Sequence, residues 1–354
     1  MHKFSAFSGL CQFLRKFGLS KSPYAMVLLL GASGLLGHNV LRLLLERGEA
    51  VRVLLRPGSG LLPEACPDGL LPEILRGSLL DYGTLLAASE GCSAIINCAG
   101  TTDMSLRRLD DYRPVNRDLP AMLCRVLDAT GIRTLVHTST ANTIAPGPRE
   151  HPTDESAPFA PPFDRSLYAI SKKEGEDLLL DHAAAHPERR IVIVNPGFMV
   201  GAFDPKPSSG TLLLAAWRKP LMAAPGGGKS FLHVRDAATA VCNALTCGDT
   251  GRYLLTGTSL TLKEFYALQA RVCGYRQRFF TLPDPLVRLA GWIGDLIRAL
   301  GMRSMLCTIN VRQIMIEEWY DCSKATRELG LPHTPPEDAV RDFFAWRDRR
   351  GPGT

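Results

Sequence analysis

The sequence predicts an α/β fold in which a doubly wound parallel sheet is followed by a smaller, mostly helical lobe, and two observations carry this prediction. Over residues 26–200, short apolar runs alternate with segments of helical periodicity, which is the pattern of successive βαβ units. Beyond residue 201 the chain is first rich in Pro and Gly and then, from Leu262, mostly helical in its pattern. A length of 354 residues is enough for about two lobes.

The alternating part predicts its strands and helices one after another. Strands are expected at Met26–Leu30, Val51–Leu55, Ile95–Cys98, Thr134–Thr138 and Ile191–Asn195. Helices are expected at Leu35–Arg47, Thr84–Ser89, Leu119–Ala129 and Tyr168–His186. A helix at Val234–Leu245 and a strand at Gly251–Leu255 are expected to return to the main sheet.

Composition and charge exclude several classes of protein. The apolar fraction of 45% and the charged fraction of 21% are ordinary for a globular chain with a buried core. The net charge is +6, but the charges are interspersed, and the absence of a basic run with interleaved aromatics argues against a nucleic-acid partner. The ten cysteines form no C-x-x-C pair, so we expect a reduced, cytoplasmic chain without a disulfide framework or zinc site.

The N-terminal 25 residues and a pair of histidines each need a separate interpretation. Residues 1–25 are basic, with several Phe and Ser and no acidic residue, which fits a targeting segment, a membrane-surface helix or a leader. We expect them to be a dispensable N-terminal extension. His182 and His186 are four residues apart, a spacing that could hold a metal, but no Glu follows the first His. We interpret this pair as a polar helix end and expect no metal.

The segment Gly31-Ala-Ser-Gly34-Leu-Leu-Gly37 predicts a dinucleotide-binding turn, with Ser33 and Leu35 in contact with the ligand. It follows an apolar strand and opens an apolar helix, although its spacing is G-x-x-G-x-x-G and not the commoner G-x-G-x-x-G. Glycine is needed in so tight a turn, because a side chain would keep the backbone away from a pyrophosphate. The helix N-terminus then offers unpaired N–H groups to the phosphates.

The segment Tyr168-Ala-Ile-Ser-Lys172 is the second chemical element. Residues four apart share one face of a helix, so the ammonium can approach the phenol. A free phenol has a pKa of about 10, and we expect the positive charges of Lys172 and an oxidised nicotinamide to lower it. Thr138-Ser139-Thr140, at the end of the preceding strand, supplies hydroxyls that can hold a substrate oxygen for the phenol to protonate.

In this order, the glycine turn, Ser139-Thr140 and the Tyr168/Lys172 pair resemble the extended short-chain dehydrogenase/reductase family, also called the NAD-dependent epimerase/dehydratase family. Phe231–Asp236 and Tyr320–Ala325 resemble late motifs of its dihydroflavonol reductase and 3β-hydroxysteroid dehydrogenase branch. The resemblance implies that Tyr168 gives or takes the proton and that Lys172 lowers the pKa of Tyr168 and holds the ribose. Thr140, where the family usually has Ser, would orient the substrate oxygen, with Ser139 as the alternative.

The same resemblance implies further cofactor contacts. Asp81 matches the residue that meets the adenine, Asn97 and Ala99 match the turn after the fourth strand, and Pro196 matches the turn that meets the nicotinamide amide. Asn97 stands where many members have His. Asn116 matches the family's structural or relay Asn. We therefore expect a Rossmann-type domain over residues 26–200, to which residues 231–257 return, and a substrate lobe made mainly of residues 201–230 and 258–354.

The residue after the second strand bears on the choice of cofactor. Arg56 stands there, with no acidic residue of the kind that NAD-binding proteins usually use for the ribose 2′-OH. Its guanidinium could hold a 2′-phosphate in forked geometry, or could simply face solvent. We expect NADP, with NAD as the alternative. Gly226-Gly-Gly-Lys229-Ser230 ends like a triphosphate-binding loop, but Ala223 replaces the required first Gly, so we interpret it as a flexible substrate-side loop.

These residues favour a reductase or dehydrogenase acting on a ketone or secondary alcohol of an apolar ring compound such as a steroid. The alternatives are a nucleotide-sugar epimerase or dehydratase that retains its cofactor, and a dinucleotide-binding protein without turnover. A monomer or a homodimer is expected. Residues 285–300 predict an amphipathic helix with a broad apolar face made of Leu289, Trp292, Ile293, Leu296 and Leu300. We interpret this face as lobe core, with a substrate pocket or a peripheral membrane contact as the alternative.

Overall fold

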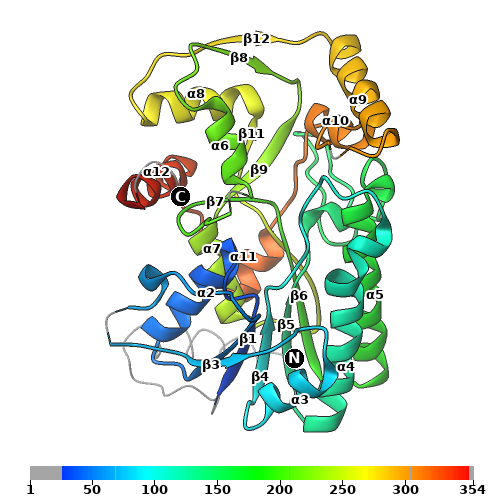
Figure 1. The fold of residues 1–354 in the computed structure, drawn as a ribbon, viewed down its shortest axis with the longest axis vertical. Helices are drawn as coiled ribbons and strands as arrows, with labels where there is room; N and C mark the ends of the chain where they lie inside the picture. The colour runs from blue at the N-terminus through cyan, green and yellow to red at the C-terminus, as the bar shows by residue number, and fades with distance from the viewer. Residues whose placement is uncertain (1–25, 68, 207, 303, 351–354) are drawn as a thin grey trace.

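A computed structural model of the chain describes residues 26–350, apart from residues 68, 207 and 303. Its centre is a seven-stranded sheet in the order β10-β6-β5-β4-β1-β2-β3, and each pair of neighbouring strands is parallel (Figure 1). The chain order reverses between β1 and β4, which is the predicted doubly wound topology. The strands are β1 (Val27–Leu30), β2 (Val51–Leu55), β3 (Glu73–Arg76), β4 (Ala94–Asn97), β5 (Thr134–Thr138), β6 (Arg190–Pro196) and β10 (Gly251–Leu255).

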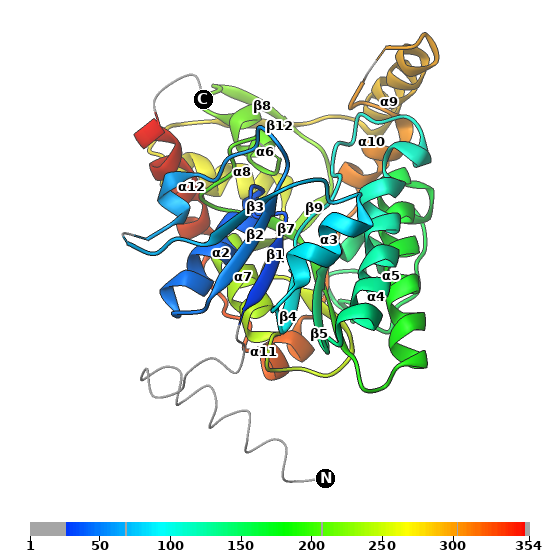
Figure 2. The same ribbon diagram turned by 60° about the horizontal axis from the view of Figure 1, so that its bottom comes forward.

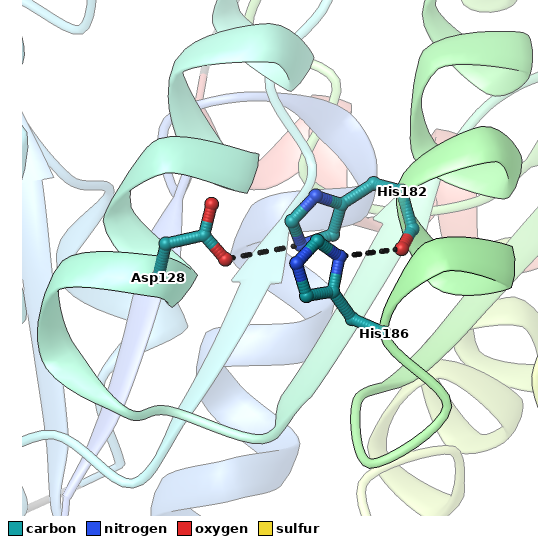
Figure 3. Close-up of side chains that lie close together, drawn as sticks. All are labelled: Asp128, His182 and His186. Carbon is teal, nitrogen blue, oxygen red and sulfur yellow. Dashed lines mark hydrogen bonds and ion pairs between the residues drawn. The ribbon is translucent and has the colours of Figure 1, made fainter.

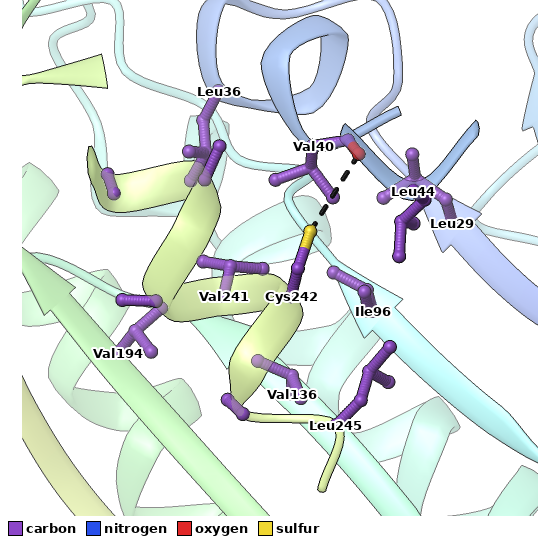
Figure 4. Packing of buried hydrophobic residues seen from close by; sticks show 14 of the residues in the cluster. Leu29, Leu36, Val40, Leu44, Ile96, Val136, Val194, Val241, Cys242 and Leu245 are labelled. Atoms are coloured by element: carbon purple, nitrogen blue, oxygen red, sulfur yellow. Dashed lines mark hydrogen bonds between the residues drawn. The ribbon is translucent and has the colours of Figure 1, made fainter. Parts of the chain in front are cut away.

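Helices cover both faces of this sheet, and β1 shows how the sequence builds a core on each side. Val27 and Leu29 belong to one buried cluster and Leu28 and Leu30 to the other, because successive side chains of a strand point to opposite faces. The first face is covered by α2 (Leu35–Glu46), α7 (Val234–Asn243) and α11 (Ser323–Leu329), and the second by α3 (Tyr82–Ser89), α4 (Leu119–Thr130) and α5 (Leu167–Ala185) (Figure 2). Figure 4 shows the first core, where the Cys242 thiol of α7 faces the Val40 carbonyl oxygen of α2.

A second, smaller group of elements follows the sheet in sequence. It contains the three-stranded sheet β11-β9-β7 and the two-stranded ribbon β12-β8. The strands are β7 (Phe198–Val200), β8 (Leu221–Ala224), β9 (Gly228–His233), β11 (Thr258–Thr261) and β12 (Arg278–Thr281), and the helices are α6 (Gly210–Ala216), α8 (Leu262–Val272), α9 (Asp284–Ala299), α10 (Thr308–Met315) and α12 (Pro336–Arg350). Within the described ranges, no helix is both long enough and apolar enough to cross a bilayer.

The predicted strands and helices before residue 200 are confirmed, with ends that differ by at most two residues, and β10 returns to the main sheet as expected. The sequence prediction missed β3. This strand pairs with β2 on one side only, and Arg52 of β2 forms an ion pair of 3.0 Å with Glu73. Most of its side chains are exposed, so no apolar alternation marks it in the sequence.

The expectation of a flexible loop at residues 226–230 was wrong. Residues from Gly228 onward form β9, which lies between β7 and β11. Lys229 forms an ion pair with the buried carboxylate of Glu318 and donates to the Gln313 backbone oxygen at 3.1 Å. These partners come from far along the chain, so the glycine-rich sequence alone could not reveal them.

The interpretation of the apolar face of residues 285–300 as lobe core was also wrong. All five of its predicted members are exposed, whereas the buried residues of α9 are Val287, Gly291 and Gly294. A Cβ at Gly294 would lie 1.9 Å from the Leu306 backbone oxygen, and one at Gly291 would lie 3.1 Å from the Thr308 Cα. The helix therefore packs through its glycines, because only they allow the chain entering α10 to come so close.

Candidate active site

The glycine turn between β1 and α2 forms a cradle that side chains would fill. Gly31 has a φ of +77°, and a Cβ there would lie 2.4 Å from the Ala99 backbone nitrogen. A Cβ at Gly37 would lie 2.0 Å from the Gly31 oxygen. Gly34 is exposed and is the N-cap of α2, with no side-chain cap among the described residues. The N–H groups of the first helical turn are thus available to phosphate oxygens, and the turn fits a dinucleotide pyrophosphate.

The turn after β4 links this glycine cradle to α5, the helix that carries Tyr168 and Lys172. Asn97 is buried, its Oδ1 accepts from the Ala99 N–H at 3.0 Å, and its Nδ2 lies 3.1 Å from His137 Nδ1. Asn97 therefore shapes the turn from inside. One residue beyond Ala99, a Cβ at Gly100 would lie 2.9 Å from Lys172 Nζ. The turn must be this small for the ammonium to lie directly beside it.

Lys172 lies on α5, in the second helical turn, with its ammonium buried at the end of β5. Ser166 caps the helix by accepting from the Ala169 N–H at 3.5 Å. The Lys172 Nζ donates to the Thr138 backbone oxygen at 2.9 Å. Burial lowers the pKa of Lys172 to about 8, and the nearby Glu176 carboxylate acts in the opposite direction. The side chain is thus held in place, and its charge changes within an accessible pH range.

The Tyr168 phenol and the Thr140 hydroxyl face each other at the end of β5. We call the group formed by Tyr168, Lys172 and Thr140 the catalytic corner. Burial raises the pKa of Tyr168, while a hydrogen bond from the Thr140 hydroxyl lowers it. The net direction is upward, which differs from the lowering that the sequence predicted. Desolvation of the phenolate, together with the Glu176 charge, outweighs the hydrogen bond, and Lys172 is not among the groups that shift this pKa. The charge of oxidised nicotinamide, which the prediction also invoked, comes only with bound cofactor. Thr140 also accepts from the Asn142 N–H at 3.3 Å and so begins the short helical turn η4 (Ala141–Thr143).

Asn116 supports the site from behind. It lies in η3 (Pro114–Asp118), a single π-helical turn, which is a form common at functional sites. Its Oδ1 accepts from the Thr101 N–H at 2.8 Å, and its Nδ2 donates to the Thr101 oxygen at 3.0 Å and to Ser171 Oγ at 2.9 Å. Ser171 in turn donates to the Tyr168 carbonyl oxygen at 2.7 Å. Asn116 thus joins the loop after β4 to the catalytic helix.

Sequence reasoning missed Glu176, which continues the face of α5 that carries Tyr168 and Lys172. Glu176 is fully buried, and burial raises its pKa. Its Oε1 accepts from Thr143 Oγ1 at 2.8 Å and from Asn195 Nδ2 at 2.5 Å. The spacing of Tyr, Lys and Glu at successive intervals of four was the available signal, because such residues share one helix face.

The remaining predicted contacts lie around the cradle. Arg56 is exposed directly after β2, at the carboxyl edge of the sheet. Asp81 is exposed and caps α3, accepting from the Thr84 N–H at 2.7 Å and Thr84 Oγ1 at 2.6 Å. Ser33 and Leu35, on either side of Gly34, are half-buried. Pro196 is at the end of β6, in register with Leu255. These five residues lie at or just after a strand end, in the glycine turn or, for Asp81, at the helix start after β3, which are the places where dinucleotides bind in this topology.

The two histidines at the end of α5 lie apart from this site, and the fold brings Asp128 of α4 to them (Figure 3). His182 Nε2 is 3.5 Å from an Asp128 carboxylate oxygen, and His186 Nδ1 donates to the His182 backbone oxygen at 3.0 Å. The Arg189 guanidinium is 3.8 Å from the same carboxylate and already supplies a positive charge. We keep the interpretation of a polar helix end, now joined to α4 by this contact.

The comparisons with known proteins agree with this geometry. Residues 27–255 match the NAD dependent epimerase/dehydratase family, and the chain belongs to it. The cradle and the Tyr–Lys–Thr corner therefore define an NAD(P)-dependent oxidoreductase of the short-chain dehydrogenase/reductase type.

Relatives and a solved structure extend the likeness over nearly the whole chain. "Sterol demethylase protein B" of Methylococcus capsulatus is 29% identical over 92% of this chain and 98% of its own. A "4-hydroxy-2-methyl-3-oxo-4-farnesyl-3,4-dihydroquinoline-1-oxide ketoreductase" of Stigmatella aurantiaca is also 29% identical, over 88% of this chain and 94% of its own. The crystal structure of gox2253 superposes with a TM-score of 0.78 at 25% identity, over 93% of this chain and 99% of that one.

Proposed function

We propose that this enzyme transfers hydride between NADP and a ketone or secondary alcohol of an apolar ring compound, such as a steroid. The observation that carries the proposal is the corner formed by Tyr168, Lys172 and Thr140 beside the glycine cradle. The names of two relatives support the substrate class. The Methylococcus capsulatus protein is named for a sterol, and the Stigmatella aurantiaca protein is named as the ketoreductase of a farnesylated ring compound. None of the described cysteines forms a disulfide, which supports the predicted cytoplasmic location.

Each residue of the corner has a role in this proposal. Bound NADP supplies or accepts the hydride at the substrate carbon. Tyr168 gives the proton to the substrate oxygen in reduction and takes it in oxidation, and Thr140 holds that oxygen by a hydrogen bond. The buried ammonium of Lys172, held by the Thr138 oxygen at 2.9 Å, favours the phenolate form of Tyr168 and binds the ribose. Asn116 and Glu176 keep the corner in shape.

The choice of NADP rests on the end of β2. Arg56 is exposed there, free to reach a 2′-phosphate, and no acidic residue competes for the ribose hydroxyl in Val51–Pro57. A guanidinium binds phosphate oxygens in forked geometry, whereas the ribose hydroxyls of NAD give it no charge to pair with.

Two alternatives can be separated from this function by turnover. A nucleotide sugar needs donors for a second pyrophosphate, and the substrate side offers mainly Arg218 and Lys219, of which Arg218 lies over the Trp217 ring at 5.0 Å. A dinucleotide-binding protein without turnover has no need for the Tyr–Lys–Thr corner.

The test is a turnover screen of purified protein against ketosteroids, hydroxysteroids and nucleotide sugars, with NADPH and NADP followed by absorbance. We expect net consumption of cofactor with steroid-like substrates and none with nucleotide sugars. Epimerisation of a nucleotide sugar without net cofactor turnover, together with inactivity on every steroid, would overturn the proposal.

A further inference from the structure

The outer face of α9 is unusual for a helix of a globular protein. Because α9 packs through Val287, Gly291 and Gly294, its large side chains point outward. Trp292 is 62% exposed and Leu300 is 69% exposed. Scattered apolar residues on a surface are normal, but a contiguous row of large ones marks an interaction site.

The charges of α9 are turned away from this face. Asp295 accepts from the Thr308 N–H and hydroxyl, and Arg298 donates to the backbone oxygens of Met104 at 3.1 Å and Leu106 at 2.9 Å. Polar partners inside the protein therefore satisfy both groups. Of the four charged side chains of α9, Arg288 and Asp284, the first residue of the helix, are exposed. The outward face is thus almost purely apolar.

Further exposed apolar side chains lie near the helix, in the segment that follows it and in a neighbouring ribbon, and we call the whole set the α9 surface. More than half of the exposed large apolar side chains among the described residues belong to residues 286–306. The ribbon β12-β8 adds two more at the same end of the molecule (Figures 1 and 2). The members are Leu221, Phe280, Leu286, Leu289, Trp292, Ile293, Leu296, Leu300, Met302, Met305 and Leu306.

Basic side chains border the α9 surface. A cavity of about 390 Å³ lies between Gly301, at the end of α9, and the loop that carries Arg107 and Arg108. Both arginines are exposed, and Arg108 lies 3.8 Å from Asp110, one of two acidic neighbours. With Arg288 on the helix and Arg278 opposite Leu221 in the ribbon, the apolar face has four exposed cations at its edge, beside the exposed acids Asp110, Asp111 and Asp284. That combination suits phospholipid, whose anionic headgroups lie just above its acyl chains.

We propose that the α9 surface docks the enzyme onto a bilayer that contains anionic phospholipid. The helix would lie in the plane of the interface, with Trp292 at headgroup level and the leucines among the upper acyl chains. A protein partner would need a matching groove, whereas a bilayer needs only an apolar face with cations at its edge.

The docked helix is connected directly to the active site. Asn310 of α10 donates to the Met104 oxygen at 3.2 Å, beside the contact from Arg298. This loop starts at Gly100, against Lys172, and Tyr112 donates to the Asp103 oxygen at 2.6 Å while its ring faces Tyr168 at 6.4 Å. Docking would therefore hold the loop that leads to the catalytic corner close to the bilayer, from which a lipophilic substrate would be delivered. That delivery role rests on the proposed function, whereas the docking itself does not.

The test is co-sedimentation of the full chain with vesicles of phosphatidylcholine and phosphatidylserine in equal parts, and with phosphatidylcholine alone. The variant Trp292→Ser/Leu296→Ser/Leu300→Ser is compared with a control that changes exposed apolar residues of the dinucleotide-binding domain, Leu71→Ser/Leu80→Ser/Leu178→Ser. We expect the first variant to lose binding by about tenfold or more, since each buried apolar side chain contributes substantially. The control should bind like the unchanged protein. Cofactor titration confirms that both variants are folded.

A second variant, Arg107→Glu/Arg108→Glu, tests the charged edge. It should weaken binding to the mixed vesicles and abolish the preference for them over phosphatidylcholine. The proposal is overturned if the unchanged protein ignores both kinds of vesicle, or if the Trp292 variant binds them equally well. It is also overturned if the unchanged protein forms dimers that this variant dissolves without any vesicle binding. None of these readouts needs turnover, so failure of the proposed substrate class would leave them unaffected.

Discussion

The carboxylate of Glu176 accepts a hydrogen bond of 2.5 Å from the side-chain amide of Asn195, in the interior behind the catalytic corner. The same amide lies 3.1 Å from the Thr140 backbone oxygen, to which it also donates. The contact therefore joins α5, β6 and Thr140, the residue that we propose holds the substrate oxygen. One turn away on α5, the Glu176 charge raises the pKa of Lys172 against the effect of burial. The pH dependence of turnover should therefore report on the protonation of Lys172 and on the charge of Glu176 beside it.

We predict that kcat/KM for ketone reduction falls as the pH rises above about 8. Burial lowers the pKa of Lys172 to about 8, so the ammonium is present below that pH and is lost as the pH rises through it. Without the ammonium, the developing phenolate of Tyr168 loses the positive charge that lies four residues along the same helix face. A pH profile of kcat/KM reports on the free enzyme and checks this. A profile that stays flat to pH 10 in this assay would show that Lys172 does not titrate there.

Glu176→Gln is expected to move the alkaline fall in kcat/KM to lower pH while the protein stays folded. Gln keeps an oxygen that accepts from Asn195 and Thr143 but removes the charge that raises the pKa of Lys172. Glu174→Gln is the matched control, because Glu174 pairs at 2.7 Å with Arg113 on the side of α5 away from the corner. If both variants shift this fall equally, or if neither does, Glu176 has no electrostatic role in the site.

Tyr168→Phe should lower turnover by about 100-fold or more, because a positioned acid–base group contributes at least that much. The ring still packs near Tyr112, so dinucleotide affinity should stay within a few-fold. Steady-state kinetics and cofactor titration measure the two effects separately. Near-normal activity of this variant would refute the proposed proton transfer.

Arg56→Ala should weaken NADP binding and leave NAD binding nearly unchanged. A lost charge-assisted contact to phosphate costs about 1.5–3 kcal/mol, or roughly tenfold to hundredfold in affinity. The control is Arg76→Ala, at the end of the neighbouring strand, whose guanidinium donates to the Ser59 oxygen at 2.8 Å. Equal losses for both cofactors on changing Arg56 would make that residue structural and remove the case for NADP.

The sequence by itself determined the order of strands and helices up to residue 196 apart from β3, the glycine turn, and the placing of Tyr168 and Lys172 on one helix. These features depend on residues a few positions apart. Apolar residues at every second position mark a strand, and residues four positions apart mark one face of a helix. A tight turn requires glycine whatever surrounds it. The sequence could therefore name these residues by number, whereas their roles in the site stay predictions.

Only the tertiary structure decided which way the later elements face. The sequence showed a broad apolar face on α9 and predicted that it is buried, yet the buried face is the one with Gly291 and Gly294. It showed a glycine-rich loop at residue 226, yet Glu318, far along the chain, completes a buried strand there. The Glu176–Asn195 contact likewise joins two separate elements. The sequence pattern shows how apolar one face of an element is. Whether that face is buried depends on which distant part of the chain packs against it.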